Sequence, residues 1–378
     1  MDELDYGMSV SLAEVRLLLT RTHRSVEQGE SPSRSKVEKQ TEAADALTFG
    51  NWAEKYFAEA DQSLRQKSLT LRSSLQRKPA MKSETLRVLI ALDGSPSSMA
   101  VARCWSTWAS TRVSLEATLL TVAGDTAGNM ANTLGIKPMV DAIASVQAWF
   151  AQSGLALECV VVEGGSPATR IIDEAQRRQV DLIAMGTRGL SPLRGLLLGS
   201  VAAQVTRSSP MPIWLMGPHA VTPAALGQRL RLLVAVDGSV HAAHAAAWAG
   251  AMVTRLGEAS IELFSVQHAF SPFEGMLDAA AGDFRHWGQG VGEAAIAAAR
   301  QFMGAAGHQA TAAVATGDAL PIILAHADEI GADVIVVAPQ GVNALEQAVL
   351  GSVSQSLLQS ARCPVLIVPR NLKIDDPD

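Results

Sequence analysis

The stretch that decides the fold reads DLIAMGTRG at residues 181–189 and, nine residues further on, GS at residues 199–200. Its apolar run predicts a buried strand, after which Gly186 and Gly189 leave backbone N–H groups open to an anion. The segment from Ser200 predicts a helix whose free N-terminal amides and dipole favour negative charge, with the hydroxyl as a further donor. Two anion-binding elements are therefore expected at one spot, although a tight turn with close helix packing explains the glycines equally well.

The same pattern returns later in the chain. Gly341, nine residues and Gly351-Ser352 again follow an apolar run, and LLVAVDGS at residues 232–239 repeats VLIALDGS at residues 88–95. This spacing indicates a tandem duplication of a unit of about 135 to 145 residues.

Each unit alternates apolar strands with helical segments. Near-continuous runs of Val, Ile and Leu are typical of strands buried on both faces, so the order predicts a parallel, doubly wound α/β sheet. In such sheets ligands bind outside the carboxyl ends of the strands. Asp93 and Gly186 both lie at such ends.

With these residues the chain resembles tandem members of the universal stress protein family. That family's fingerprint is Gly-x-x-Gly, nine residues, then Gly-Ser or Gly-Thr, together with a first strand that ends in Asp. It is complete in residues 85–218 and partial in residues 229–370. The resemblance implies two tandem five-stranded sheet domains of the adenine-nucleotide alpha-hydrolase type, and pairing through the last strands, which a tandem chain could make within itself; a homo-oligomer is a further alternative.

The resemblance also implies a ligand, ATP or AMP with or without Mg²⁺, and a role in stress survival or signalling rather than catalysis. It assigns the adenine-nucleotide contacts to one set of residues in the first unit: Asp93, Val122, Met185, Gly186, Arg188, Gly189, Arg194, Gly199, Ser200 and Val201. In this set Asp93 would face the ribose or the base edge, Val122 would offer backbone groups to the adenine, and Met185 would line the base pocket. The glycines, the serine and the valine after it would cradle the phosphates.

Some roles in this set stay open. The two arginines could reach the outer phosphates or be solvated loop charges, and Asp93 could equally be a helix N-cap. No catalytic residue is assigned, since only Asp93 could act as a general base, and slow ATP hydrolysis is the weaker alternative. A nucleotide-independent scaffold is another.

The second unit departs from the fingerprint at four positions: Gly186 becomes Ala338, Thr187 becomes Pro339, Arg188 becomes Gln340 and Arg194 becomes Glu346. Proline removes one N–H donor, alanine restricts the backbone, and the acid would repel a phosphate. The first unit is therefore predicted to be the nucleotide site. The second is predicted to be a degenerate copy, which could still hold an adenosine or a smaller anion.

Residues 1–84 have a different character. They hold 26 charged residues, against 42 in the remaining 294, and they are not duplicated. Apolar spacing predicts amphipathic helices over residues 11–26 and 41–77. This charged helical extension is either an interaction or oligomerisation module for an unknown protein partner, or a pair of helices folded against the neighbouring unit.

Composition limits the remaining alternatives. The net charge of −6 argues against nonspecific nucleic-acid binding, and no apolar run is long enough to cross a membrane. The three cysteines are scattered, which favours reduced buried thiols and a cytoplasmic protein. His241 and His244 lack a third metal ligand. The stretch GQGVG at residues 288–292 falls short of a dinucleotide fingerprint and is predicted to be a flexible connection.

Overall fold

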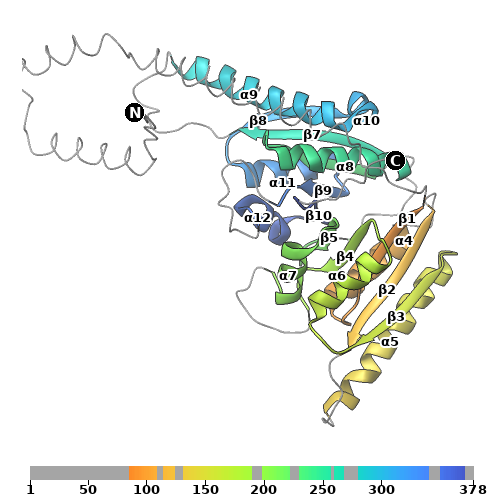
Figure 1. The fold of residues 1–378 in the computed structure, drawn as a ribbon. Helices are drawn as coiled ribbons and strands as arrows, with labels where there is room; N and C mark the ends of the chain where they lie inside the picture. Colours follow the sequence, from red (N-terminus) through yellow and green to blue (C-terminus); the bar gives the residue numbers. More distant parts are fainter. Residues whose placement is uncertain are drawn as a thin grey trace, which may run out of the picture. The chain divides into compact units, whose positions relative to one another are not determined.

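The structure, a computed structural model, describes residues 85–108, 114–123, 131–189, 198–221, 230–256, 259–267, 280–339 and 350–370. The predicted helices of residues 1–84 lie outside these residues. In the first repeat (residues 85–218) strands and helices alternate (Figure 1). Its elements are β1 (Leu86–Ala91), α4 (Pro96–Trp108), β2 (Leu115–Ala123), α5 (Ala131–Gln152), β3 (Leu157–Glu163), α6 (Pro167–Arg177), β4 (Leu182–Gly186), α7 (Ser200–Ser208) and β5 (Ile213–Met216).

The second repeat (residues 229–370) follows the same order with one additional short helix. Its elements are β6 (Leu230–Ala235), α8 (Val240–Leu256), β7 (Ala259–Gln267), α9 (Ala280–Met303), α10 (Ala305–Gln309), β8 (Thr311–Thr316), α11 (Ala319–Ile330), β9 (Val334–Val337), α12 (Ser352–Ser360) and β10 (Val365–Ile367). Local signals explain several boundaries: Pro167 opens α6, and Gly331 ends α11 in the left-handed conformation at φ 61°.

The ten strands form one sheet in the order β3-β2-β1-β4-β5-β10-β9-β6-β7-β8. Every pairing within a repeat is parallel, and both repeats use the same internal order, which confirms the predicted doubly wound α/β class. The repeats meet through their last strands, which run antiparallel with Leu366 opposite Trp214. The expected pairing of the last strands within one chain is therefore present, and it joins the two five-stranded sheets into one.

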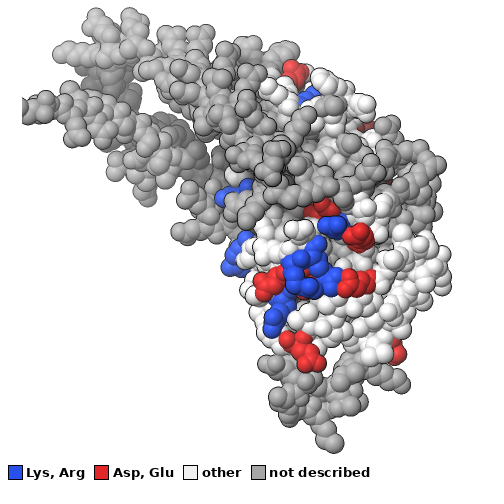
Figure 2. Space-filling model, turned by 45° about the vertical axis from the view of Figure 1, so that its right-hand side comes forward, with Lys and Arg blue, Asp and Glu red and all other residues white. Residues whose placement is uncertain are grey.

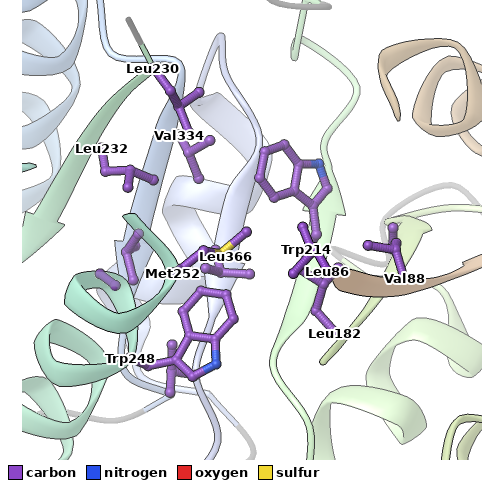
Figure 3. Close-up of a cluster of buried hydrophobic side chains, with 14 of the residues drawn as sticks. Leu86, Val88, Leu182, Trp214, Leu230, Leu232, Trp248, Met252, Val334 and Leu366 are labelled. Carbon is purple, nitrogen blue, oxygen red and sulfur yellow. The ribbon is translucent and has the colours of Figure 1, made fainter. Parts of the chain in front are cut away.

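The core has two layers, one on each face of the sheet, and both layers contain side chains of both repeats. Along β5, Trp214 and Met216 belong to the layer under α4, α5, α8 and α9, whereas Ile213 and Leu215 belong to the layer under α6, α7, α11 and α12. This period of two is the geometry of a strand buried on both faces. Figure 3 shows Trp214 of β5 near Leu366 of β10 in the first of these layers.

The predicted flexible connection at residues 288–292 is wrong, because these residues lie inside α9. A Cβ added at Gly292 would lie 2.5 Å from Cγ1 of Val314, so this glycine lets α9 approach β8 closely. Gly292 therefore serves the packing of this helix against the sheet.

The three cysteines are free thiols, with Cys104 buried and Cys159 and Cys363 partly buried. Burial raises the pKa of the Cys104 and Cys363 thiols to about 12, so neither is a thiolate near neutral pH. Across the described residues, no helix is both long and apolar enough to cross a lipid bilayer.

Candidate functional site

The candidate site lies where the neighbouring parallel strands β1 and β4 end. Ile90 of β1 pairs with Ala184 of β4, so the segments that follow the two strands emerge side by side at one edge of the sheet. The chain leaves β1 toward β2 and leaves β4 toward β5, which makes this pair the switch point in strand order. Asp93 follows β1 by two residues, and Thr187 to Gly189 follow β4 directly.

The Asp93 carboxylate faces both its own turn and the glycine loop, residues 186–199 between the end of β4 and the start of α7, of which residues 190–197 lie outside the described part. Its Oδ1 accepts a hydrogen bond from the Ser95 N–H at 3.0 Å. A Cβ added at Gly189 would lie 2.5 Å from Oδ2, so only a glycine allows the loop backbone to pass this close to the carboxylate. Asp93 and Gly189, 96 positions apart in the chain, are thus brought together at the strand ends.

Asp93 is not the N-cap of the following helix. That position belongs to Ser95, which directly precedes α4 and whose Oγ accepts a hydrogen bond from the Ser98 N–H at 3.3 Å. The second repeat repeats the arrangement, with Ser239 accepting from the Ala242 N–H at 3.1 Å. The serine of each Asp-Gly-Ser caps the helix, and the aspartate accepts a hydrogen bond from the N–H of that serine within the turn before the helix.

The two ends of the glycine loop meet at the start of α7. The Gly199 N–H donates to the Thr187 carbonyl at 2.8 Å. A Cβ at Gly199 would lie 3.2 Å from that oxygen, which again favours glycine. Within the part of the chain that the structure describes, no side chain caps α7, and Ser200, its first residue, is exposed. The first amides of α7 and the Ser200 hydroxyl are therefore available to an anion.

Gly186 has a packing role that the loop pattern did not reveal. It is the last residue of β4, and a Cβ added there would lie 2.7 Å from the Ser97 Cβ in the first turn of α4. The absence of a side chain at Gly186 thus lets α4 sit directly against the end of β4.

The remaining predicted contacts lie around this edge. Met185 is buried in the core layer under α6 and α7, and Val122 and Val201 are partly buried against the same layer. Arg188 is exposed. Arg194 lies outside the described residues. Three apolar side chains thus share one face of the sheet, next to the polar edge.

The second repeat builds the same frame with different chemistry. The Gly351 N–H donates to the Pro339 carbonyl at 2.6 Å, as Gly199 does to Thr187. Here the Ser354 hydroxyl also donates to the Ala338 carbonyl at 2.9 Å, a bond made from α12. Gln340 and Glu346, two of the four positions at which the second unit departs from the fingerprint, lie outside the described residues.

His241 gives the second site a further difference. It stands at the position of Ser97 in the first turn of its helix and is partly buried. Burial lowers the pKa of its imidazole, and the nearby Arg370 charge lowers it further, with Asp237 acting in the opposite direction. A neutral imidazole is therefore favoured near neutral pH.

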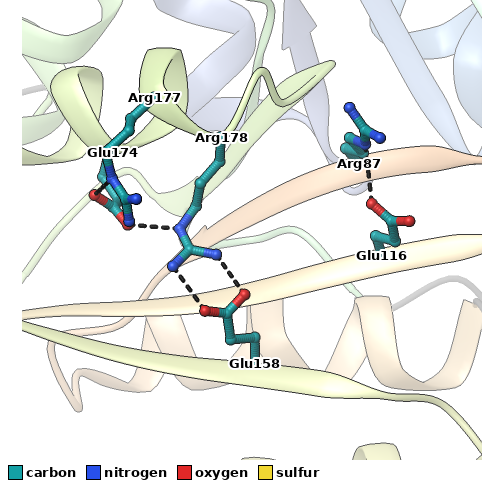
Figure 4. Close-up of polar contacts among 6 residues, drawn as sticks. All are labelled: Arg87, Glu116, Glu158, Glu174, Arg177 and Arg178. Atoms are coloured by element: carbon teal, nitrogen blue, oxygen red, sulfur yellow. Dashed lines mark hydrogen bonds and ion pairs between the residues drawn. The ribbon is translucent and has the colours of Figure 1, made fainter.

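Sequence reasoning missed a charged network on α6 and β3. Glu174 pairs with Arg177 and Arg178, both at 2.5 Å, and Arg178 makes a two-pronged contact with Glu158 (Figure 4). Figure 2 shows arginines and carboxylates gathered on one face. The hydrogen bonds from Arg177, then Arg178, lower the pKa of Glu174 to about 2. The spacing of three and four residues was the available signal.

Comparison with known proteins assigns the family. The model of the universal stress protein family matches residues 84–216 and again residues 229–369, which together make up more than half of the chain. The chain therefore belongs to the universal stress protein family and carries two copies of its unit.

Individual relatives agree with this assignment. Universal stress protein YxiE of Bacillus subtilis (strain 168) is 45% identical over 62 residues, which are 16% of this chain and 42% of that protein. A universal stress protein of Thermus aquaticus is 38% identical over 66 residues, 18% of this chain and 48% of that protein. The chain thus spans less than half the length of these relatives in each match. The crystal structure of a universal stress protein from Archaeoglobus fulgidus DSM 4304 covers 77% of this chain and 100% of its own, with TM-score 0.54 and 23% identity, and shows the shared fold.

Proposed function

We propose that the first repeat binds an adenine nucleotide, ATP or AMP, at the carboxyl ends of β1 and β4, and that occupancy of this site rather than turnover is its output in a stress response. The observation that carries the proposal is the approach of Asp93 Oδ2 to Gly189, beside the uncapped start of α7. A carboxylate and the start of a helix thus lie near the point at which Gly199 returns to Thr187 and Gly189.

These two groups suit two parts of a nucleotide, the ribose and the phosphates. A carboxylate accepts hydrogen bonds from ribose hydroxyls, and amides at the start of a helix bind phosphate oxygens. The exposed Arg188 adds a cation at the loop. The second repeat lacks the glycine beneath the loop and has Pro339, which has no N–H donor, at the position of Thr187. We therefore expect one nucleotide per chain.

A charge placed at the start of α7 tests the proposal with a matched control. In Ser200→Asp the new carboxylate would occupy the phosphate position, and we expect ATP affinity to fall at least about tenfold, which corresponds to about 1.4 kcal/mol. The fold should tolerate the change, because an acid in the first turn of a helix stabilises it by about 0.3–1 kcal/mol. The equivalent change Ser352→Asp, at the start of α12, should leave ATP affinity within about twofold.

Titration calorimetry with ATP, AMP and GTP, with and without Mg²⁺, provides the measurement. Equal losses in the two variants would contradict the assignment to the first repeat. A wild-type protein that binds none of the three nucleotides would instead be a nucleotide-independent scaffold. Multiple turnovers of ATP to ADP would assign an ATPase in place of a binding protein.

A further inference from the structure

A serine in the first turn of α4 holds the start of the glycine loop. The Ser97 hydroxyl donates a hydrogen bond to the Arg188 carbonyl, and the Ser95 hydroxyl donates to the same oxygen at 3.4 Å. Arg188 precedes Gly189, the residue that passes Asp93. One backbone carbonyl is thus fixed by two hydroxyl groups that come from a different element of the fold.

This contact depends on Gly186. A Cβ at residue 186 would lie 2.7 Å from the Ser97 Cβ and 3.0 Å from the Ser97 carbonyl carbon, and closer still to its hydroxyl oxygen. Real Cβ atoms do not approach other atoms this closely without a shift of the neighbour. Gly186 and Ser97 therefore form a pair, in which the missing side chain of one makes room for the hydroxyl of the other.

The second repeat has neither member of the pair. Ala338 stands at the position of Gly186, and His241 stands at the position of Ser97. In the described part of the second repeat, the Ser354 hydroxyl of α12 donates to the Ala338 carbonyl. The residue at the position of Arg188, Gln340, lies outside the described residues. The bond from Ser97 thus comes from the face of the sheet that α4 covers, and the bond from Ser354 comes from the face that α12 covers.

We infer that Ser97 is a positioning residue, which fixes the Arg188 carbonyl and thereby presets the backbone at Gly189 for a phosphate group. Backbone that is already held at Arg188 and Gly189 loses less conformational freedom when the ligand binds, so the hydroxyl raises affinity without touching the ligand. The part that concerns phosphate rests on the proposed nucleotide site. The part that concerns the loop does not.

Tryptic cleavage after Arg188 tests the loop directly in the ligand-free full chain, because the carbonyl that Ser97 binds is the one that trypsin attacks. We expect Ser97→Ala to speed this cleavage about three- to tenfold, the range that loss of one hydrogen bond implies. Ser97→Thr, which keeps the hydroxyl, should restore the wild-type rate. The control variant His241→Ala, at the equivalent position of the second repeat, should leave cleavage after Arg188 unchanged.

Mass spectrometry of the peptides separates a local from a general effect. Cleavage after Arg207, at the end of α7, reports the stability of the whole repeat and should not change. Faster cleavage at both sites, or an unchanged rate after Arg188, would overturn the inference.

The ligand arm compares ATP with adenosine by calorimetry. Since Ser97 acts on the loop and adenosine carries no phosphate, Ser97→Ala should weaken ATP by about three- to tenfold and leave adenosine within about twofold. Equal losses for both ligands would overturn the assignment to phosphate. If the wild-type protein bound neither ligand, the proposed function would fall together with the phosphate role, while the cleavage rates would still decide the hold on the loop.

Discussion

At the end of β4 the first repeat has Gly186 beneath Ser97, whereas at the end of β9 the second repeat has Ala338 with Ser354 bonded to its carbonyl. The strands that lead to these two places pair in the same order and direction. The bond between the helix N-cap and the segment after the fourth strand is also present in both. The comparison teaches that the frame of the site belongs to the fold, and that a few residues at the strand ends decide what the frame can bind.

The largest effect is expected where the two repeats share one core. Trp214 of β5 is 1% exposed, and its ring lies 5.2 Å from that of Trp105. Trp214→Ala should reduce the free energy of unfolding by about 3–5 kcal/mol. Trp149 of α5 is only partly buried, so Trp149→Ala should reduce the free energy of unfolding by a smaller amount. Urea unfolding followed by circular dichroism should show a single transition for both repeats, and two separate transitions would mean that the shared core does not couple them.

The next effect concerns ligand binding and sharpens the contrast between the repeats. Asp93→Asn keeps an oxygen to accept the Ser95 N–H but removes the charge. Nucleotide affinity should fall by more than about tenfold, since a hydrogen bond to a charged group contributes about 1.5–3 kcal/mol. The equivalent change Asp237→Asn should not alter calorimetric affinity. A comparable loss in both variants would place a second nucleotide in the other repeat.

A third change exchanges the residues beneath the two loops. Gly186→Ala should destabilise the protein by about 1–3 kcal/mol, because the new methyl group overlaps Ser97. Ala338→Gly removes a buried methyl group and should cost about 1 kcal/mol. Thermal unfolding measures both variants. If Gly186→Ala were neutral, the close approach of α4 to β4 would have no energetic weight.

The smallest effect is a difference in acid sensitivity. The pKa of Glu174 is held at about 2 by Arg177 and Arg178, so its contribution to stability is complete above the unfolded pKa of about 4.3 and is lost as the pH falls from about 5 to about 2. In Glu174→Gln the free energy of unfolding should therefore fall less steeply with pH over this range. The difference from wild type should be about 1 kcal/mol after allowance for the solvent exposure of Arg177. Glu116→Gln, which removes an exposed ion pair with Arg87, serves as the control and should change the free energy of unfolding by less than about 1 kcal/mol. A slope that is the same in wild type and Glu174→Gln would contradict the prediction.

The fold could be predicted because its signals are local and repeated. Apolar runs, glycine spacing and the double Asp-Gly-Ser indicated the strands, the strand ends and the duplication. Asp93 and Gly189, which the structure brings together, are both among the predicted site residues, and the ligand contacts of that set stay predictions. The contact of Ser97 with Arg188 could not be read in this way, because it joins residues 91 positions apart and depends on how α4 is placed on the sheet. The helical state of residues 288–292 was missed for the same reason, since the close packing of Gly292 on Val314 outweighs the low helix propensity of glycine.

The antiparallel contact between β5 and β10 lies within one polypeptide, and this has a consequence for mass action. Two separate subunits dissociate on dilution, whereas tethered halves keep a fixed local concentration and a strict one-to-one ratio. In a symmetric dimer every substitution also appears twice. Covalent fusion breaks that symmetry, so the second repeat can carry Ala338 and His241 while the first repeat keeps Gly186 and Ser97 at the equivalent positions.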